Sequence, residues 1–362
     1  MKFLVCFLLL LTTSVALAAQ EPPPNLALDR LKGPVRTIKS GTVGFVLKDG
    51  KRVENTRRVA KILRFDERGN RTEATTLDSD GTVSERLVYS YDALGRNTGY
   101  EEYYRLAGKA MGDPRRHIYT LDHNGKIVER ISYEADGSVG PRFNYKYDSK
   151  GNKLEDSFTS WTGGRIGRTS YTYDADGHVL THTDYDADGA VSWKTIDSYD
   201  AAGRRVEWAQ YQEQVLRYKK LFRYDHKGRI AEEETFVFDV SRAVNSHGPE
   251  PGKVVYTYND KRHSTEIATY DPAGALKLRE VHTYDKHDNQ VGRELFNADG
   301  SARPTEVAFF DEKRAVKLSG KSHTQFQYDS HGNWTKKVYL ILPDGAQEPQ
   351  PWRADFRNIT YY

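Results

Sequence analysis

Hydrophobic and polar residues alternate along much of this chain with a period of two. Aromatic residues stand two apart in five pairs: Tyr145 and Tyr147, Tyr171 and Tyr173, Phe222 and Tyr224, Tyr256 and Tyr258, and Phe326 and Tyr328. The residues between them, such as Lys146 and Thr172, are polar. Because successive side chains of a strand point to opposite faces, this pattern predicts antiparallel strands with one buried, tyrosine-rich face and one face in solvent.

A repeated unit is superimposed on this alternation. Each unit begins with an aromatic residue, followed by Asp, two variable residues and Gly, and successive aromatic positions are mostly 26 residues apart. The Asp and Gly of the complete units are Asp66 and Gly69, Asp92 and Gly95, Asp148 and Gly151, Asp174 and Gly177, Asp200 and Gly203, Asp225 and Gly228, and Asp329 and Gly332. Degenerate units begin at Leu121, Tyr258, Tyr284 and Phe310. A fixed period indicates a repeat architecture.

Each unit predicts a tight turn. The Asp carboxylate can accept hydrogen bonds from backbone N–H groups two residues on, and the Gly can take positive φ and form a bulge. In several units a second turn signal follows 12 residues later, as in Tyr185 to Gly189. The turns leave strands of roughly seven to nine residues between them, so we assign the Asp and Gly of the units a structural role.

The predicted fold is all-β: an antiparallel meander of repeated β-hairpins coiled into an elongated, solenoid-like or partly closed sheet. Roughly twenty strands are expected, and twisted open sheets rarely exceed about ten strands without curling. The expected organisation is a signal peptide at 1–18, an N-terminal cap and first strands at 19–59, repeats at 60–340 and a closing strand at 341–362. The repeats are interrupted at 106–116 and 234–253. A division into two barrel-like or sandwich-like halves near 234–253 is the alternative.

The first residues predict export. A positive start at Met1 and Lys2, an apolar run from Phe3 to Leu11 and small residues at Ala16 to Ala18 are typical of a signal peptide. The apolar run is shorter than the roughly 20 residues of a membrane-spanning helix. We therefore expect a periplasmic or extracellular protein without a transmembrane anchor. The single cysteine, Cys6, lies in this segment, so we expect no disulfide.

Composition and charge limit the classes of partner that this protein is expected to bind. The sequence has 24 tyrosines, 54 Lys and Arg residues and 51 Asp and Glu residues, with a formal net charge of +3. Basic and acidic residues are interleaved along the sequence, and a nucleic-acid-binding chain would instead concentrate basic residues. We therefore expect no nucleic-acid partner.

Few residue groups suggest catalysis or metal binding. Asp184 to Gly189 matches the first half of an EF-hand loop, but the twelfth position is Thr195 where that loop needs Glu. His178 and His182 are four apart, which on a strand places them too far apart to share a zinc ion. We assign no catalytic residue, no metal ligand and no cofactor. A pair of carboxylates that cleaves glycosidic bonds is the enzymatic alternative.

The turn motif resembles that of a known family. The segments Tyr91 to Arg96 and Tyr147 to Asn152 look like the repeat of RHS, or YD-repeat, proteins, and the resemblance covers residues 60–340. The flanks Leu31 to Val35 and Gly332 to Lys336 look like those of small secreted members. The resemblance implies a ribbon of β-hairpins that coils into a spiral or shell.

The sequence also departs from the large members of that family. The segment closest to their self-cleavage motif, Asp271 to Ala275, has Ala275 where the motif has Leu, and no toxin-like domain is expected. The expected function is a non-catalytic scaffold or binding protein that contacts an envelope protein or glycan. The alternatives are a shell-like fragment that houses a separate effector, and an envelope carbohydrate hydrolase.

Overall fold

The computed structural model describes residues 31–105, 111–160, 163–238, 249–261, 263–311 and 314–362. The expected signal peptide, with Cys6, and parts of both predicted interruptions lie outside these residues. The described part of the chain consists of strands and their connections, without a helix. It therefore has no helix long and apolar enough to cross a membrane.

The described residues form 25 strands. The first thirteen are β1 (Val35–Lys48), β2 (Lys51–Glu54), β3 (Arg58–Phe65), β4 (Arg71–Leu77), β5 (Val83–Tyr91), β6 (Asn97–Tyr104), β7 (Arg115–Leu121), β8 (Ile127–Tyr133), β9 (Val139–Tyr147), β10 (Lys153–Thr159), β11 (Arg165–Tyr173), β12 (Val179–Tyr185) and β13 (Val191–Tyr199). The others are β14 (Arg205–Gln212), β15 (Val215–Tyr224), β16 (Ile230–Val237), β17 (Gly252–Tyr258), β18 (Ser264–Tyr270), β19 (Leu276–Tyr284), β20 (Gln290–Asn297), β21 (Ala302–Arg303), β22 (Thr305–Asp311), β23 (Arg314–Tyr328), β24 (Trp334–Pro343) and β25 (Gln350–Tyr361).

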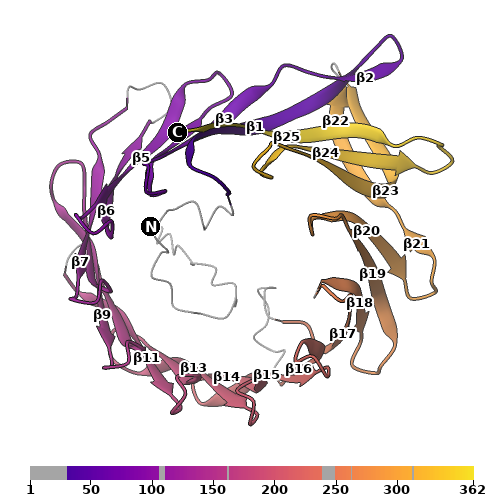
Figure 1. Ribbon diagram of the computed structural model, residues 1–362. Coiled ribbons are helices and arrows are strands. Elements are labelled where there is room, and N and C mark those ends of the chain that lie inside the picture. Colours follow the sequence, from indigo (N-terminus) through magenta and orange to yellow (C-terminus); the bar gives the residue numbers. More distant parts are fainter. Residues whose placement is uncertain (1–30, 106–110, 161–162, 239–248, 262, 312–313) are drawn as a thin grey trace, which may run out of the picture.

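These strands form one antiparallel sheet that closes on itself (Figure 1). Each strand from β3 to β20 pairs with the next, β20 pairs with β23, and β23, β24 and β25 follow in order. β1 pairs with both β3 and β25, which completes a ring of 22 strands within the described residues. The predicted all-β meander of hairpins is confirmed, and its sheet closes fully.

The sheet is continuous across the predicted break at 234–253. β16 pairs with β17 from Glu232 opposite Val255 to Thr235 opposite Gly252. The alternative of two barrel-like or sandwich-like halves is therefore wrong, because one sheet spans the break. β2, β21 and β22 stand outside the ring and pair with β1, β20 and β23.

Connections alternate between the two edges of the ring. The turns of the predicted units lie on one edge, with one exception, because a meander returns to the same edge after every second strand. We call this edge the first rim. The second turn signals lie on the other edge, the second rim. Phe310 is an exception, because β22 runs away from the first rim and ends at the second.

Close packing is concentrated where the ring closes. One buried cluster consists of Val35, Ile38, Leu63, Phe65 and Ala74 from β1, β3 and β4. A second consists of Val43, Phe45 and Ala354 from β1 and β25. Both clusters involve β1, so the joint is the best-packed part of the described chain.

Aromatic residues lie on both faces of the sheet. Tyr171 and Thr169 share one face, which we call the first face, and Asp184 pairs with Thr169. Tyr185 directly follows Asp184 and so lies on the second face, where the Arg168 guanidinium is 3.9 Å from its ring centroid. Most of these tyrosines are half-buried. In each of the five predicted aromatic pairs, both rings are buried or half-buried and the polar residue between them is exposed, as the alternation predicts. The second face is not purely polar, because it also carries tyrosines such as Tyr185, whose ring is covered by the Arg168 side chain.

Candidate functional site

The repeated turn holds its Asp in a fixed set of hydrogen bonds. At Asp225, the carboxylate oxygen Oδ1 accepts the backbone N–H groups of Lys227 and Arg229, both at 2.9 Å. The N–H of Gly228 donates to the Asp225 carbonyl at 2.9 Å, and Gly228 has φ +75°. A residue with a side chain is strained at such a φ.

The other predicted units have the same geometry. Each Asp carboxylate accepts the backbone N–H of the residue four positions on, at 2.7 to 3.0 Å: Asp66, Asp92, Asp148, Asp174, Asp200 and Asp329. The corresponding glycines have φ between +72° and +91°: Gly69, Gly95, Gly151, Gly177, Gly203 and Gly332.

The residue after the turn glycine has a role that sequence reasoning missed. Arg229 Nε donates to Asp225 Oδ2 at 2.7 Å, and its guanidinium lies 4.5 Å from the ring centroid of Tyr258 in the next unit. His178 likewise contacts Asp174 Oδ2 at 2.8 Å and stacks on Tyr199. The signal was present in the sequence, because this position holds Asn, Arg, Lys or His in every unit except the degenerate one at Phe310, which has Ala315.

The tyrosine of each unit is bonded to the unit before it. Tyr258 Oη donates to the Ile230 carbonyl at 2.7 Å, and Ile230 stands two residues after Gly228. The equivalent bonds, from 2.6 to 2.9 Å, are made by Tyr91, Tyr147, Tyr173, Tyr199, Tyr224 and Tyr284. We call this series the tyrosine row. It connects consecutive hairpins along the first rim.

Electrostatics keep the turn carboxylates ionised. The backbone N–H of Arg229, and then its side chain, lower the pKa of Asp225 to about 2. The side chain of Arg204 lowers the pKa of Asp200, and the side chain of His178 lowers that of Asp174. A carboxylate with a lowered pKa is a poor general acid at neutral pH, so these residues do not suit proton donation.

Asp197 on the first face is different from the turn carboxylates. It is buried, with 8% exposure, and burial raises its pKa. Arg205 Nη1 lies 3.1 Å from Asp197 Oδ1, and Trp208 is its cross-strand neighbour. A raised pKa can mark a catalytic acid, but structural ion pairs also perturb pKa values. Because Arg205 is its ion-pair partner, the raised pKa of Asp197 does not by itself assign this residue a catalytic role.

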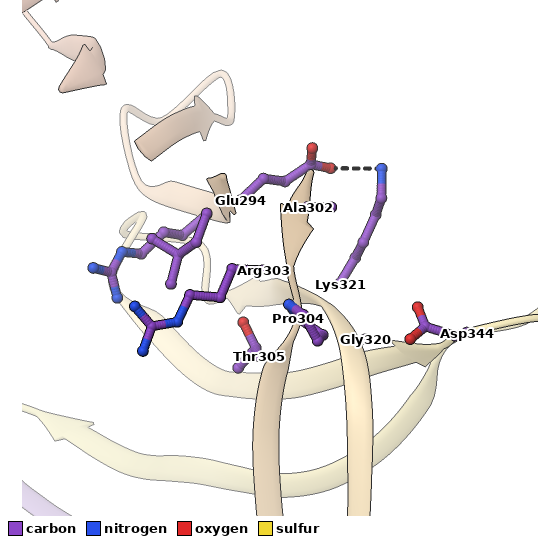
Figure 2. Close-up of a pocket in the computed structure, with 10 residues that line it drawn as sticks. Glu294, Ala302, Arg303, Pro304, Thr305, Gly320, Lys321 and Asp344 are labelled. Carbon is purple, nitrogen blue, oxygen red and sulfur yellow. Dashed lines mark ion pairs between the residues drawn. The ribbon is translucent and has the colours of Figure 1, made fainter. Parts of the chain in front are cut away.

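Two surface pockets among the described residues differ in size and place. The smaller, of about 80 Å³, lies where β20, β21, β22 and β23 meet (Figure 2). Its wall carries an ion pair of 3.1 Å between Glu294 and Lys321. The other, of about 380 Å³, is an open depression between the first-rim turns at Asp66 and Asp92.

One group of possible metal ligands converges in the described part of the chain. Ligand atoms of Asp174, Asp176 and His178 lie within 4.8 Å of one another. Asp174 and His178 also make the same turn contacts as their counterparts in other units. Asp184, from the EF-hand-like segment, instead accepts a hydrogen bond from Thr169 at 2.7 Å.

The two rims differ in charge, which the interleaved sequence did not reveal. Exposed carboxylates of the described residues gather in the second-rim connections: Asp49, Asp78, Asp80, Asp113, Asp136, Asp186, Asp188, Glu213, Glu250, Asp299, Asp344 and Glu348. The first-rim turns carry exposed residues of both signs, with Arg68, Lys150, Lys227, Lys261 and Lys286 as cations and Glu67, Asp176, Asp260 and Asp288 as carboxylates. The second rim is therefore acidic, whereas the first rim has a nearly balanced charge.

Comparisons with known proteins give distant likenesses. No protein-family model and no curated protein matches this sequence. Among solved structures, the chain is similar to a TcdB2–TccC3–Cdc42 complex, with 15% identity over 81% of this chain and 16% of that chain, and a TM-score of 0.38. It is also similar to a Photorhabdus luminescens Tc holotoxin pore, with 13% identity over 82% of this chain and 19% of that one, and a TM-score of 0.28.

A third likeness is to a porin-like protein from Bacteroides uniformis. The identity is 10% over 91% of this chain and 99% of the other, with a TM-score of 0.30. This chain spans less than a fifth of the two toxin chains. Likenesses this remote assign neither a family nor an activity.

Proposed function

We propose that this chain is an exported, non-catalytic scaffold or binding protein of the RHS, or YD-repeat, kind that contacts an envelope protein or glycan. The observation that carries the proposal is that the fold itself uses the polar groups of the repeated motif. The turn carboxylates accept backbone N–H groups, and the tyrosine hydroxyls donate to backbone carbonyls. Export rests on the apolar segment within residues 1–18.

The first face supports binding. Around Asp197 it carries Trp193, Trp208 and Gln210, which are half-buried and come from the neighbouring strands β13 and β14. Aromatic rings beside amide and hydroxyl groups suit a ligand with both apolar and hydrogen-bonding surface, as in a polypeptide or a glycan.

A shell that houses a separate effector is the second candidate, and ring closure favours it. At about 4.8 Å per strand, a ring of this many strands has a circumference of about 105 Å and a diameter of about 34 Å. Side chains fill the interior of a closed sheet of about eight strands but not of a much larger one. The side chains of the described strands alone therefore leave interior space for another polypeptide.

The hydrolase alternative lacks a supporting observation. A glycosidase of the usual kind needs two carboxyl groups roughly 5 to 10 Å apart, one of them with a raised pKa. Asp197 has a raised pKa, but its charged partner is Arg205. We therefore do not propose catalysis.

Affinity capture tests the proposal. Tagged protein of residues 19–362 is incubated with envelope extract from its host, and bound proteins and glycans are quantified for the wild type, Trp208→Ala and Leu94→Ala. Leu94 is a control because its side chain is 77% exposed on the first rim. We expect a stoichiometric partner that Trp208→Ala reduces and Leu94→Ala retains.

The outcomes separate the candidates. A protein partner retained by both variants would favour the shell. Recovery of glycan alone would contradict a protein scaffold. Recovery of nothing would contradict the proposal.

A further inference from the structure

The joint between β25 and β1 has the register of an ordinary first-rim turn. In an unbroken unit, Tyr147 pairs with Lys153, and a bulge follows Lys153. At the joint, Tyr361 pairs with Val35, and a bulge follows Val35. Lys153 stands two residues after the turn glycine Gly151, just as Val35 stands two residues after Gly33. The pairing at the joint therefore matches an unbroken turn residue for residue.

The hydrogen bond that closes an unbroken turn is also present at the joint. The N–H of Asp148, the residue after the aromatic, donates to the Asn152 carbonyl at 2.9 Å. At the joint, the N–H of Tyr362 donates to the Pro34 carbonyl at 3.0 Å. Gly33 has φ +80°, within the range of the turn glycines. One backbone bond differs: the N–H of Gly151 donates to the Asp148 carbonyl at 3.0 Å, whereas at the joint the N–H of Val35 donates to the Gly33 carbonyl at 2.9 Å. The glycine conformation and the closing hydrogen bond agree with the register.

The joint has no Asp at the position of the turn Asp. Neither of the two N–H groups that the Asp carboxylate would accept is left without an acceptor at the joint. In an unbroken turn these donors belong to the residues on either side of the glycine. At the joint these residues are Lys32 and Pro34. Pro34 has no N–H, and the N–H of Lys32 donates to Asn333 Oδ1 at 2.8 Å. Tyr362 can therefore occupy the Asp position without leaving either of these two donors unpaired.

The preceding turn contacts the joint much as other turns contact the next unit. Asn333, which follows the turn glycine Gly332, donates from Nδ2 to the Lys32 carbonyl at 2.7 Å and to Tyr361 Oη at 2.8 Å. The ring of His331 stacks on Tyr361 with centroids 4.0 Å apart. Tyr361 thus has the place of a unit tyrosine, although its hydroxyl contacts Asp329 instead of a backbone carbonyl.

We infer that Tyr361 and Tyr362, together with Leu31 to Val35, form one more unit of the ring, split between two distant parts of the sequence. Through this split unit, the last strand, β25, pairs with the first strand, β1, and closes the ring. In unbroken units, two residues separate the Asp from the Gly, and here Leu31 and Lys32 supply them between Tyr362 and Gly33. A direct peptide bond from Tyr362 to Leu31 would therefore give a turn of ordinary length.

A circular permutant tests the inference. The chain is rearranged to 1–30, 301–362 and 31–300, so that Tyr362 is bonded to Leu31 and the ring is opened in the exposed second-rim turn between Gly300 and Ser301. The matched control has two glycines inserted between Tyr362 and Leu31. We expect the direct permutant to have the higher melting temperature. A higher melting temperature for the control would overturn the split unit.

Point variants of the unpermuted chain give a second test if neither permutant folds. Gly33 and Gly50 both have positive φ, but a Cβ at Gly33 would lie 2.7 Å from the His331 ring, whereas a Cβ at Gly50 would meet nothing within 4 Å. Gly33→Ala should lower the melting temperature more than Gly50→Ala and speed hydrogen exchange in β1. Equal melting temperatures and unchanged exchange in β1 would contradict the inference.

Discussion

At the scale of the residue, the first-rim turn explains why each position of the motif has its residue type. Asp supplies an acceptor for two N–H groups that the turn leaves unpaired, and Gly takes the positive φ that closes the hairpin. The residue after Gly binds the Asp and often covers the next tyrosine. Each motif therefore both shapes its own turn and attaches it to a neighbour.

Gly177 provides a direct test of the backbone requirement. It has φ +91°, and a Cβ there would make only an ordinary contact with Asn152 Oδ1 at 3.6 Å. Gly177→Val should therefore destabilise the fold through backbone strain, by on the order of 1 kcal/mol or more. Ala175→Val, in the same turn, is the control. Thermal unfolding of both variants checks this, and equal melting temperatures would show that positive φ is not required.

The charge of the turn Asp predicts a pH dependence. The folded pKa of Asp225 lies at about 2, below the ordinary value of 3.8, so its stabilising contribution is present above about pH 4 and is lost as pH falls toward 2. Asp225→Asn keeps an oxygen acceptor, as Asn259 does in its own turn. The variant should melt below the wild type at pH 6, and the difference should shrink at pH 2.

Thermal scans at pH 6, 4 and 2 measure this difference. Asp344→Asn, at an exposed second-rim position, is the matched control and should show little change with pH relative to the wild type. A constant difference between Asp225→Asn and the wild type at all three pH values would refute the electrostatic account.

The sequence predicted the chemistry of a single turn but not the contacts between turns. Alternation and the Asp–Gly spacing are local, so the hydrogen bonds expected of Asp could be worked out from one unit. The contact of Arg229 with Tyr258 joins residues 29 positions apart in the chain, and only the strand register brings them together. The raised pKa of Asp197 is similarly set by tertiary burial.

At the scale of the element, the junction of β20 with β23 is the exception in the ring. Only Gly292 and Arg293 pair with β23, opposite His323 and Ser322, whereas β23 and β24 are paired over nine positions. The turn predicted at Phe310 and Asp311 is not a first-rim turn. These residues match the motif, but they end β22 at the second rim. An aromatic residue followed by Asp does not predict in which direction its strand runs, and therefore does not predict at which rim the strand ends.

Hydrogen exchange should locate this weak junction. Amide protons of β20 that face β23 should exchange faster than those of β24, because few cross-strand hydrogen bonds protect them. Site-resolved mass spectrometry of the native protein measures both strands in one experiment. Equal protection of β20 and β24 would show that the junction is held by contacts other than strand pairing.

At the scale of the whole molecule, closure depends on segments that carry no complete motif. The repeat count and sheet twist predicted that the ribbon curls, but Leu31 to Val35 and Tyr361 to Tyr362 lack the Asp that marks a unit. Only the pairing register of β1 with β25 shows that these two segments together are equivalent to a first-rim turn. Closing so long a loop costs entropy that grows only slowly with length, and the two buried clusters at the joint offset it.

The ring also separates charge, which leads to a prediction for the whole molecule. The formal net charge is +3, so a protein with evenly spread charge should not bind an anion exchanger at pH 7. Because exposed carboxylates gather on the second rim, we expect retention on the exchanger at low ionic strength and release as salt screens the contact.

Neutralising part of that rim tests the cause. The double variant Asp186→Asn and Asp188→Asn removes two exposed second-rim charges, and Glu67→Gln with Asp176→Asn removes two exposed first-rim charges. Both variants have the same net charge, so any difference in retention reports where the charges lie. The second-rim variant should elute at lower salt than the first-rim variant. Identical elution would mean that retention follows net charge, and that the separation of charge between the rims has no effect on association.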